Sequence, residues 1–181
     1  MEKDKVLYRK FLKGDEKSFD VLMNRYMEKL IYFINGFVKN LDVSEDLAQD
    51  VFVYILLNKK HYDFKYSLKT YLFMIGKSRA LNYLKKNSKI IELDDKDFLI
   101  DEDEIEEIIF KKEKNKRVRD VIKQLPLEQR QAVYLADIEE ISYKEICDIL
   151  DISMSKAKTL IHRGRKKLKK MLNEKGIRCY E

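Results

Sequence analysis

The sequence predicts an all-α fold made of two small helical domains joined by an acidic linker. Five glycines and one proline among 181 residues leave few places where a helix has to stop. Along most of the chain, apolar residues recur at steps of three and four, which is the spacing of a buried helix face. Between residues 92 and 107 acidic side chains crowd together with Lys96 as the only base, and this change of composition marks a linker. We therefore expect a first domain over residues 1–88, the linker over 89–112 and a second domain over 113–175.

Two helices are expected to open the first domain. Residues 6–13 suit a short helix that Gly14 closes, and Asp15 is a favourable cap for the next helix. That helix should span residues 16–39, because its apolar side chains keep the spacing of one buried face. These side chains are Phe19, Leu22, Tyr26, Leu30, Phe33 and Phe37. Core packing explains all of them, so none of them points to a ligand.

A third helix is expected to start at Ser44, whose hydroxyl is a favourable N-cap. The acids Glu45 and Asp46 would then lie in its first turn, at the positive end of the helix dipole. Its inward-facing residues are expected to be Leu47, Val51 and Ile55. Gln49 and Asp50 share the other faces with Asp46, where solvated surface is the simplest interpretation.

Residues 59–67 break the helical pattern with aromatic and basic side chains, among them Tyr62 and Phe64. Unstacked nucleic-acid bases pack on exposed aromatic rings that lie among lysines, although loop tyrosines are often half-buried instead. The helix that follows, over residues 68–86, is apolar in its first half and basic or polar in its second half. That second half is a candidate DNA-binding face, with Asn82 suited to read a base edge.

In the second domain, a helix is expected to begin near Asp103 and to run towards Pro126, followed by another over residues 127–136. The apolar residues of the first of these helices are Ile105, Ile108, Val118, Ile122 and Leu125. Apolar residues of this kind are expected along a helix that leads out of the acidic linker.

A helix-turn-helix is predicted at about residues 142–163. Ser142 and Glu145 form a capping box at its start, and Asp151 is suited to the left-handed turn between its helices. Ser153 is a good N-cap for the second helix. That helix has a packing stripe of Ala157, Ile161, Gly164 and Leu168. No acid balances the bases between residues 155 and 172, which favours nucleic-acid binding over a solvated lysine-rich surface.

Two blocks of the sequence resemble the extracytoplasmic-function group of sigma-70 family RNA polymerase sigma factors. Residues 45–52 resemble the family helix that docks on the coiled coil of the polymerase β′ subunit. Residues 71–75 and 79–86 resemble its promoter-melting and −10-reading helix. The segments that resemble its −35-reading domain are 125–130, 142–146 and 162–165. Both blocks occur in the family's order, which makes the resemblance far more specific than either block alone.

The resemblance implies a transcription initiation factor that has no enzymatic activity of its own and directs core RNA polymerase to promoter DNA. It implies contacts with the β′ coiled coil and the β flap, an anti-sigma factor as partner, and an acidic linker that lies in the polymerase's positively charged RNA path. The implied polymerase-binding residues are Asp46, Gln49, Asp50 and Phe52. The implied −10-binding residues are Tyr62, Phe64, Tyr71, Lys77, Arg79, Asn82, Lys85 and Lys86. The implied −35-binding residues are Lys156, Lys158, Thr159, His162, Arg163 and Arg165.

Some residues differ from the family pattern. Tyr71 stands where the family often has Trp, and Gly164 stands where Ala is usual. Lys85 and Lys86 replace the usual arginines, which keeps the charge but loses the bidentate fork. The promoter sequence that is read therefore does not follow from the resemblance.

Composition adds expectations about cofactors and compartment. Cys147 and Cys179 lack metal-ligand spacing, so free thiols in a reducing cytoplasm are expected. Nothing resembles a phosphate-binding loop, a zinc site or a paired-carboxylate centre, so no cofactor or metal is expected. No apolar run is long enough to span a bilayer, so membrane insertion is not expected.

Two other functions fit parts of the chain. A helix-turn-helix regulator that works without stable polymerase association would explain the C-terminal block, but it leaves residues 46–52 and the acidic linker without a role. A tyrosine recombinase would use an H-x-x-R motif such as residues 162–165, with Tyr180 as nucleophile. That motif falls on the predicted recognition helix, and the chain is short for such an enzyme.

Overall fold

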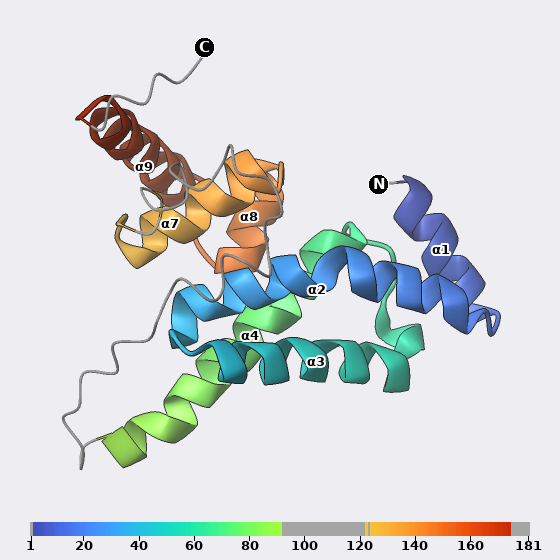
Figure 1. Cartoon of the computed structure of the whole chain (residues 1–181). Coiled ribbons are helices and arrows are strands. Elements are labelled where there is room, and N and C mark those ends of the chain that lie inside the picture. Colours follow the sequence, from blue (N-terminus) through green and yellow to red (C-terminus); the bar gives the residue numbers. More distant parts are fainter. Residues whose placement is uncertain (1, 92–121, 123, 175–181) are drawn as a thin grey trace. The chain divides into compact units, whose positions relative to one another are not determined.

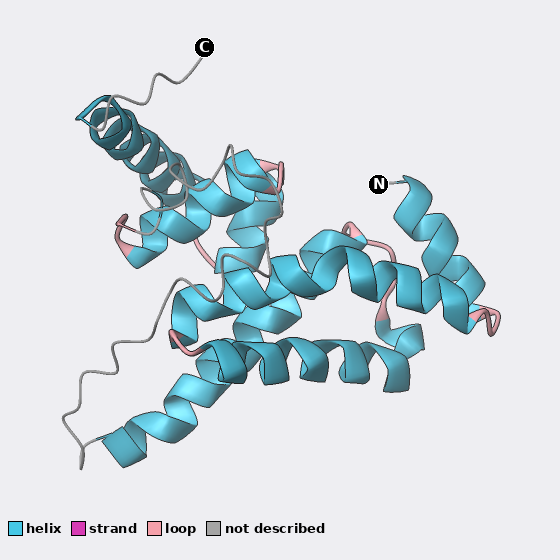
Figure 2. Ribbon diagram, viewed as in Figure 1, coloured by secondary structure: helices cyan, strands magenta, loops and turns pink. Residues whose placement is uncertain are grey.

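The computed structural model describes residues 2–91, 122 and 124–174, and throughout these ranges helices alternate with short connections (Figure 1). The chain divides into two compact units, Met1–Ile105 and Glu106–Glu181, which are described one at a time. No strand occurs in the described ranges (Figure 2), so the predicted all-α class of two helical units is confirmed. The expected linker lies outside the described residues except for 89–91, which form the end of a helix.

The first unit is organised around its second helix. It contains α1 (Glu2–Leu12), α2 (Glu16–Val38), α3 (Leu41–Leu57), the short 3-10 helix η1 (Lys59–His61) and α4 (Leu68–Ile91). The helix α2 packs against α1, α3 and α4, and α3 also packs against α4. Figure 1 shows α2 and α3 running side by side.

The ends of α2 follow the prediction. Gly14 closes α1 with a φ of +100°, and the Asp15 carboxylate accepts hydrogen bonds from the Ser18 amide at 3.3 Å and the Ser18 hydroxyl at 2.8 Å. The hydroxyl bond is the main reason that the pKa of Asp15 is lowered. At the other end, Lys39 adopts the left-handed conformation and its amide bonds to the Asn35 carbonyl. The predicted face is buried from Phe19 to Phe33, whereas Phe37 is half-buried.

The start of α3 differs from the prediction. Its N-cap is Asn40, whose side-chain oxygen accepts from the Val43 amide at 3.0 Å. Ser44 is buried one turn inside the helix, where its hydroxyl donates to the Asn40 carbonyl and to Asn35 Oδ1. The prediction that Ser44 caps this helix was therefore wrong, because Asn40 captures the first free amide a turn earlier. Val51 and Ile55 face the core as predicted, and Leu47 is half-buried.

The second unit contains α7 (Leu127–Val133), the π-helix η3 (Tyr134–Ile138), α8 (Tyr143–Leu150) and α9 (Met154–Glu174). The helix α9 packs against α7 and α8. The buried cluster beneath α9 consists of Ile122, Leu125, Val133, Leu168 and Leu172. Of the helix expected near Asp103, all but its end lies outside the described residues.

The helix predicted over residues 127–136 continues to Ile138, and its last turn is wider than an α-helical turn. The Glu139 amide bonds to the Tyr134 carbonyl five residues earlier, which is the π-helical pattern. Inside this turn the Tyr134 hydroxyl donates to Glu139 Oε1 at 3.0 Å, and both side chains are buried. Sequence periodicity gives no signal for this extra residue in the turn.

The helix-turn-helix is confirmed in its details. The Ser142 hydroxyl accepts from the Glu145 amide and donates to the Glu145 carboxylate, and Asp151 has a φ of 55°. Ser153 caps α9 by accepting from the Lys156 amide. A Cβ at Gly164 would lie 2.5 Å from Val133 Cγ2, so α9 and α7 approach closely where the packing stripe predicts a small residue.

Candidate functional site

The outer face of α3 carries three of the predicted polymerase-binding residues. Asp46, Gln49 and Asp50 are exposed. The same stripe continues with apolar side chains at helical spacing, namely Val53, Leu56 and Leu57, which are 51%, 47% and 76% exposed. We call these six residues the α3 outer face. Exposed apolar side chains grouped beside polar residues are a feature of protein-interaction surfaces. These three apolar residues were not predicted, although their helical spacing from Asp46 contains that signal.

Phe52 does not belong to this face. Its side chain is 4% exposed and lies edge-on to Phe19, with ring centroids 6.2 Å apart. A direct polymerase contact by Phe52 was therefore a wrong expectation, because the ring is part of the core that supports α3.

A shallow hollow of about 400 Å³ lies between α3 and α4. Its lining gathers three predicted −10-binding residues, Tyr71, Arg79 and Asn82, with four others. The other lining residues are Tyr54, Met74, Ile75 and Ser78. The wall is thus mixed, with aromatic rings, apolar side chains, a guanidinium and an amide within one concave surface. Such a combination suits a flat, polar-edged ligand.

The tyrosines of this hollow are held by polar contacts. The Arg79 guanidinium lies 5.6 Å from the centre of the Tyr54 ring, and the Tyr54 hydroxyl lies 3.3 Å from His61 Nδ1. Burial, followed by the charge and the hydrogen bond of Tyr54, raises the pKa of Tyr71 to about 12. Tyr71 therefore stays protonated at neutral pH.

The aromatic loop before α4 is only partly open. Tyr62 is 3% exposed, donates its hydroxyl to the Tyr66 carbonyl at 2.8 Å, and stacks on Tyr71 with centroids 5.1 Å apart. The expectation that this ring is open for base stacking was wrong for Tyr62. Phe64 is half-buried and has a φ of 63°.

The basic end of α4 continues from the hollow. Lys85 and Lys86 are exposed three and four residues after Asn82, so they share its face. Lys77 is half-buried and lies about 140° around the helix from Asn82, outside that face. The structure thus brings most of the predicted −10-binding residues to one surface of the first unit.

The recognition helix α9 exposes its cations along one side. Lys158, Thr159, His162 and Arg163 are exposed, and among the described residues no ion pair occupies Lys158, His162 or Arg163. The Thr159 hydroxyl donates to the Ser155 carbonyl of the preceding turn. These four side chains form a continuous polar patch at the spacing of one helix face.

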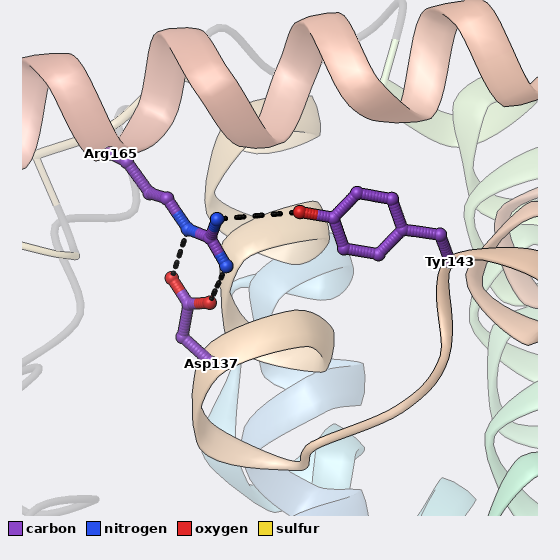
Figure 3. Close-up of polar contacts among 3 residues, drawn as sticks. All are labelled: Asp137, Tyr143 and Arg165. Carbon is purple, nitrogen blue, oxygen red and sulfur yellow. Dashed lines mark hydrogen bonds and ion pairs between the residues drawn. The ribbon is translucent and has the colours of Figure 1, made fainter.

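Two of the predicted −35 contacts are instead paired with acids of their own unit. Lys156 Nζ lies 2.6 Å from Glu128 of α7. Arg165 donates two hydrogen bonds to Asp137 of η3, through Nε at 3.1 Å and Nη2 at 2.5 Å, and a third to the Tyr143 hydroxyl at 3.3 Å (Figure 3). The bond to Asp137 raises the pKa of Arg165 further above its already high value. The bidentate geometry fixes Arg165 between η3 and α8.

In the described parts of the chain, no group of His, Cys, Asp and Glu side chains is arranged to hold a metal ion. No described helix has the length and apolar character needed to cross a membrane. Cys147 is a free, half-buried thiol, and Cys179 lies outside the described residues.

Comparison with known sequences matches both units to one family. The family model Sigma-70 region 2 matches residues 22–90, and Sigma-70, region 4 matches residues 115–168. The RNA polymerase sigma factor SigZ of Bacillus subtilis (strain 168) is 31% identical over 157 residues, which cover 86% of this chain and 87% of SigZ. The ECF RNA polymerase sigma factor SigW of the same strain is 27% identical over 177 residues, with 90% of this chain and 92% of SigW covered.

Solved structures share the fold. The sigma factor RpoE from Bartonella quintana, crystallised with the anti-sigma factor NepR, superposes with a TM-score of 0.68 at 19% identity, over 87% of this chain and 98% of RpoE. CnrH, in complex with the cytosolic domain of CnrY, gives a TM-score of 0.63 at 20% identity, over 95% of this chain and 98% of CnrH.

Proposed function

We propose a mode of action from the premise that this chain belongs to the sigma-70 family, in its extracytoplasmic-function group, and is a transcription initiation factor. Sigma factors bind core RNA polymerase and promoter DNA, and the polymerase carries out the chemistry. The family is in general not enzymatic, and we infer the same for this chain. We also infer that it acts in the cytoplasm, where its polymerase and promoters are.

The α3 outer face is the proposed docking surface for the β′ coiled coil. Its acidic end, Asp46 and Asp50, suits a basic partner helix and would guide the encounter. Its apolar end, with Leu57 76% exposed, would supply the area that holds the complex. Phe52 contributes from beneath by supporting the helix.

The hollow between α3 and α4 is the proposed site for an unstacked base of the −10 element, and it is the observation that carries the proposal. Tyr71 offers an aromatic wall, while Arg79 and Asn82 offer donors that reach a base edge. Lys85 and Lys86 lie further along the same face, where phosphates of the displaced strand would pass. Phe64 and Lys77 flank this path.

The patch on α9 is the proposed reader of the −35 element. Lys158, Thr159, His162 and Arg163 would enter the major groove, contacting phosphates and base edges. Lys156 and Arg165 lie beside this patch, and each reaches DNA only when its acid partner releases it. We assign the β-flap contact to the same unit.

We propose that residues 1–88 and 113–175 act as the two promoter-reading domains and that 89–112 is the acidic linker, occupying the polymerase's positively charged RNA path until the transcript displaces it. RpoE was crystallised with the anti-sigma factor NepR, and CnrH was solved in complex with the cytosolic domain of CnrY. On that ground we propose that an anti-sigma factor also holds this chain.

Transcription in vitro tests the proposal. The parent chain is mixed with core polymerase of its own organism and a pool of linear duplexes with randomised promoter regions, and transcript 5′ ends are sequenced. We expect the parent to enrich a two-element promoter. The double variant Asp46→Lys/Asp50→Lys should lose initiation and polymerase association while keeping its weak DNA binding, and Leu57→Asp should weaken association.

A parent chain that neither binds core polymerase nor changes where transcripts start would refute the proposal. A helix-turn-helix regulator without polymerase association would give that result while still binding DNA. Loss of DNA binding together with initiation in the double variant would contradict the separation of docking from DNA reading.

A further inference from the structure

The helix α1 has no role in the surfaces described so far, and it lies before residues 22–90, the segment that matches the region 2 family model. Its inner side is nevertheless tightly packed, with Tyr8 1% exposed and Phe11 2% exposed. The Tyr8 hydroxyl donates a hydrogen bond to the Lys59 carbonyl at 2.9 Å. This bond joins α1 to the start of the aromatic loop, 51 residues further along the chain.

Side chains of α1 also contact the aromatic rings of that loop. The Tyr8 ring is edge-on to Tyr62, with centroids 4.8 Å apart, and to Phe64, with centroids 5.9 Å apart. The Arg9 guanidinium lies 5.5 Å from the centre of the Phe64 ring. Two successive residues of α1 therefore hold Phe64.

Phe64 needs such support because of its backbone conformation. Its φ of 63° lies in the left-handed region, which bulky side chains rarely adopt. A residue in this conformation persists only when its surroundings determine it, and such residues cluster at functional sites. The contacts with Tyr8 and Arg9 are the surroundings that fix this one.

The support extends from the loop to the hollow. Tyr62 lies between the two: its ring contacts Tyr8 and Phe64 and stacks on Tyr71, which forms one wall of the hollow. A shift of α1 would therefore move the loop and, through Tyr62, the Tyr71 wall.

We propose that α1 is a positioning element for −10 recognition, in which Tyr8 and Arg9 hold the loop over residues 62–66 and the Tyr71 wall in the shape that selects the −10 sequence. This role rests on the proposed function of the hollow. Tyr8 and Arg9 themselves touch no DNA in this scheme. They act through Phe64 and Tyr62.

The test compares Arg9→Gln with a matched control, Lys10→Gln, which removes the same charge from the next, also exposed, position of α1. Each full-length variant, with core polymerase, transcribes the randomised duplex pool described above. For Arg9→Gln we expect enrichment of the preferred −10 bases to fall about two- to fivefold, the equivalent of one cation–π contact, with −35 enrichment unchanged. Arg9→Lys should keep most of the selectivity because an ammonium also binds the ring face. Lys10→Gln should resemble the parent.

Tyr8→Phe gives a second variant, since it keeps the ring contacts and removes only the bond to Lys59. It should lower −10 enrichment in the same selective way, and thermal unfolding establishes that each variant is folded in the assay. If Arg9→Gln selects −10 bases as sharply as Lys10→Gln, or if −10 and −35 enrichment fall equally, the positioning role is wrong. If the parent itself enriches no −10 sequence, the proposed function of the hollow fails, and this outcome is distinct from the first two.

Discussion

Exchanging the two charges of the Asp137–Arg165 pair tests whether Arg165 reads DNA or holds the reading helix in place. The side chains are 32% and 51% exposed, so the pair contributes about 0.5–1 kcal/mol. Arg165→Gln should therefore weaken binding to the selected promoter duplex by no more than about two- to fivefold, the full value of the pair, because α9 loses one of its ties to η3 and α8. The exchange variant Asp137→Arg/Arg165→Asp should recover most of the affinity, since it restores the pair with its charges reversed.

Fluorescence anisotropy of a labelled duplex, measured over a series of salt concentrations, provides the assay. A lost phosphate contact lowers the slope of log K against log salt by about 0.9. We expect no such change for Arg165→Gln. The control Arg163→Gln, two residues away and free of ion pairs among the described residues, should show it. A slope that falls for Arg165→Gln, together with an exchange variant that stays weak, would show that Arg165 contacts the DNA backbone directly.

Two further predictions concern stability. Gly164→Ala should destabilise the second unit by about 0–2 kcal/mol in denaturant unfolding, because about 1 kcal/mol of helix propensity opposes about 1–3 kcal/mol of overpacking against Val133. Adding Val133→Ala should remove the clash. Gly76→Ala should cost less, because its close contact is with the far end of the Leu30 side chain and its contacts with Ile34 are at an ordinary 3.5 Å. Equal losses at both glycines would refute this. The pKa of Tyr71 is raised to about 12, so its contribution to stability is complete below about pH 10 and is lost as pH rises towards 12. Tyr71→Phe should therefore make the decline in thermal stability over that interval less steep, and an unchanged decline would contradict the assignment.

Local sequence signals predicted the elements that depend on local chemistry. The capping box at Ser142, the left-handed Asp151 and the stripe that contains Gly164 were all read from neighbouring residues, and the structure confirms each of them. Gly164 also explains a departure from the family pattern, since Val133 Cγ2 occupies the space that the usual Ala would need.

The predictions that failed depend on contacts distant in the sequence or on competition between equivalent signals. Asn40 and Ser44 are both good caps, and local pattern does not decide between them. Tyr62 is buried because Tyr8 of α1 packs against it, and the composition of the loop does not indicate that contact. Arg165 pairs with Asp137, 28 positions away, and local sequence does not reveal such a pair. The cations of α9 were therefore all expected to be available for DNA.

The π-helix at residues 134–138 lies between α7 and α8 and determines where on the helix circumference the chain leaves towards α8. One surplus residue in a helical turn rotates everything beyond it by about 100° about the axis, relative to an uninterrupted α-helix. The bond from the Glu139 amide to the Tyr134 carbonyl thus fixes the direction in which the chain leaves this helix towards α8. Deleting one residue of this turn would therefore change the path towards α8, while α9 would keep its contact with α7 through Gly164 and Val133.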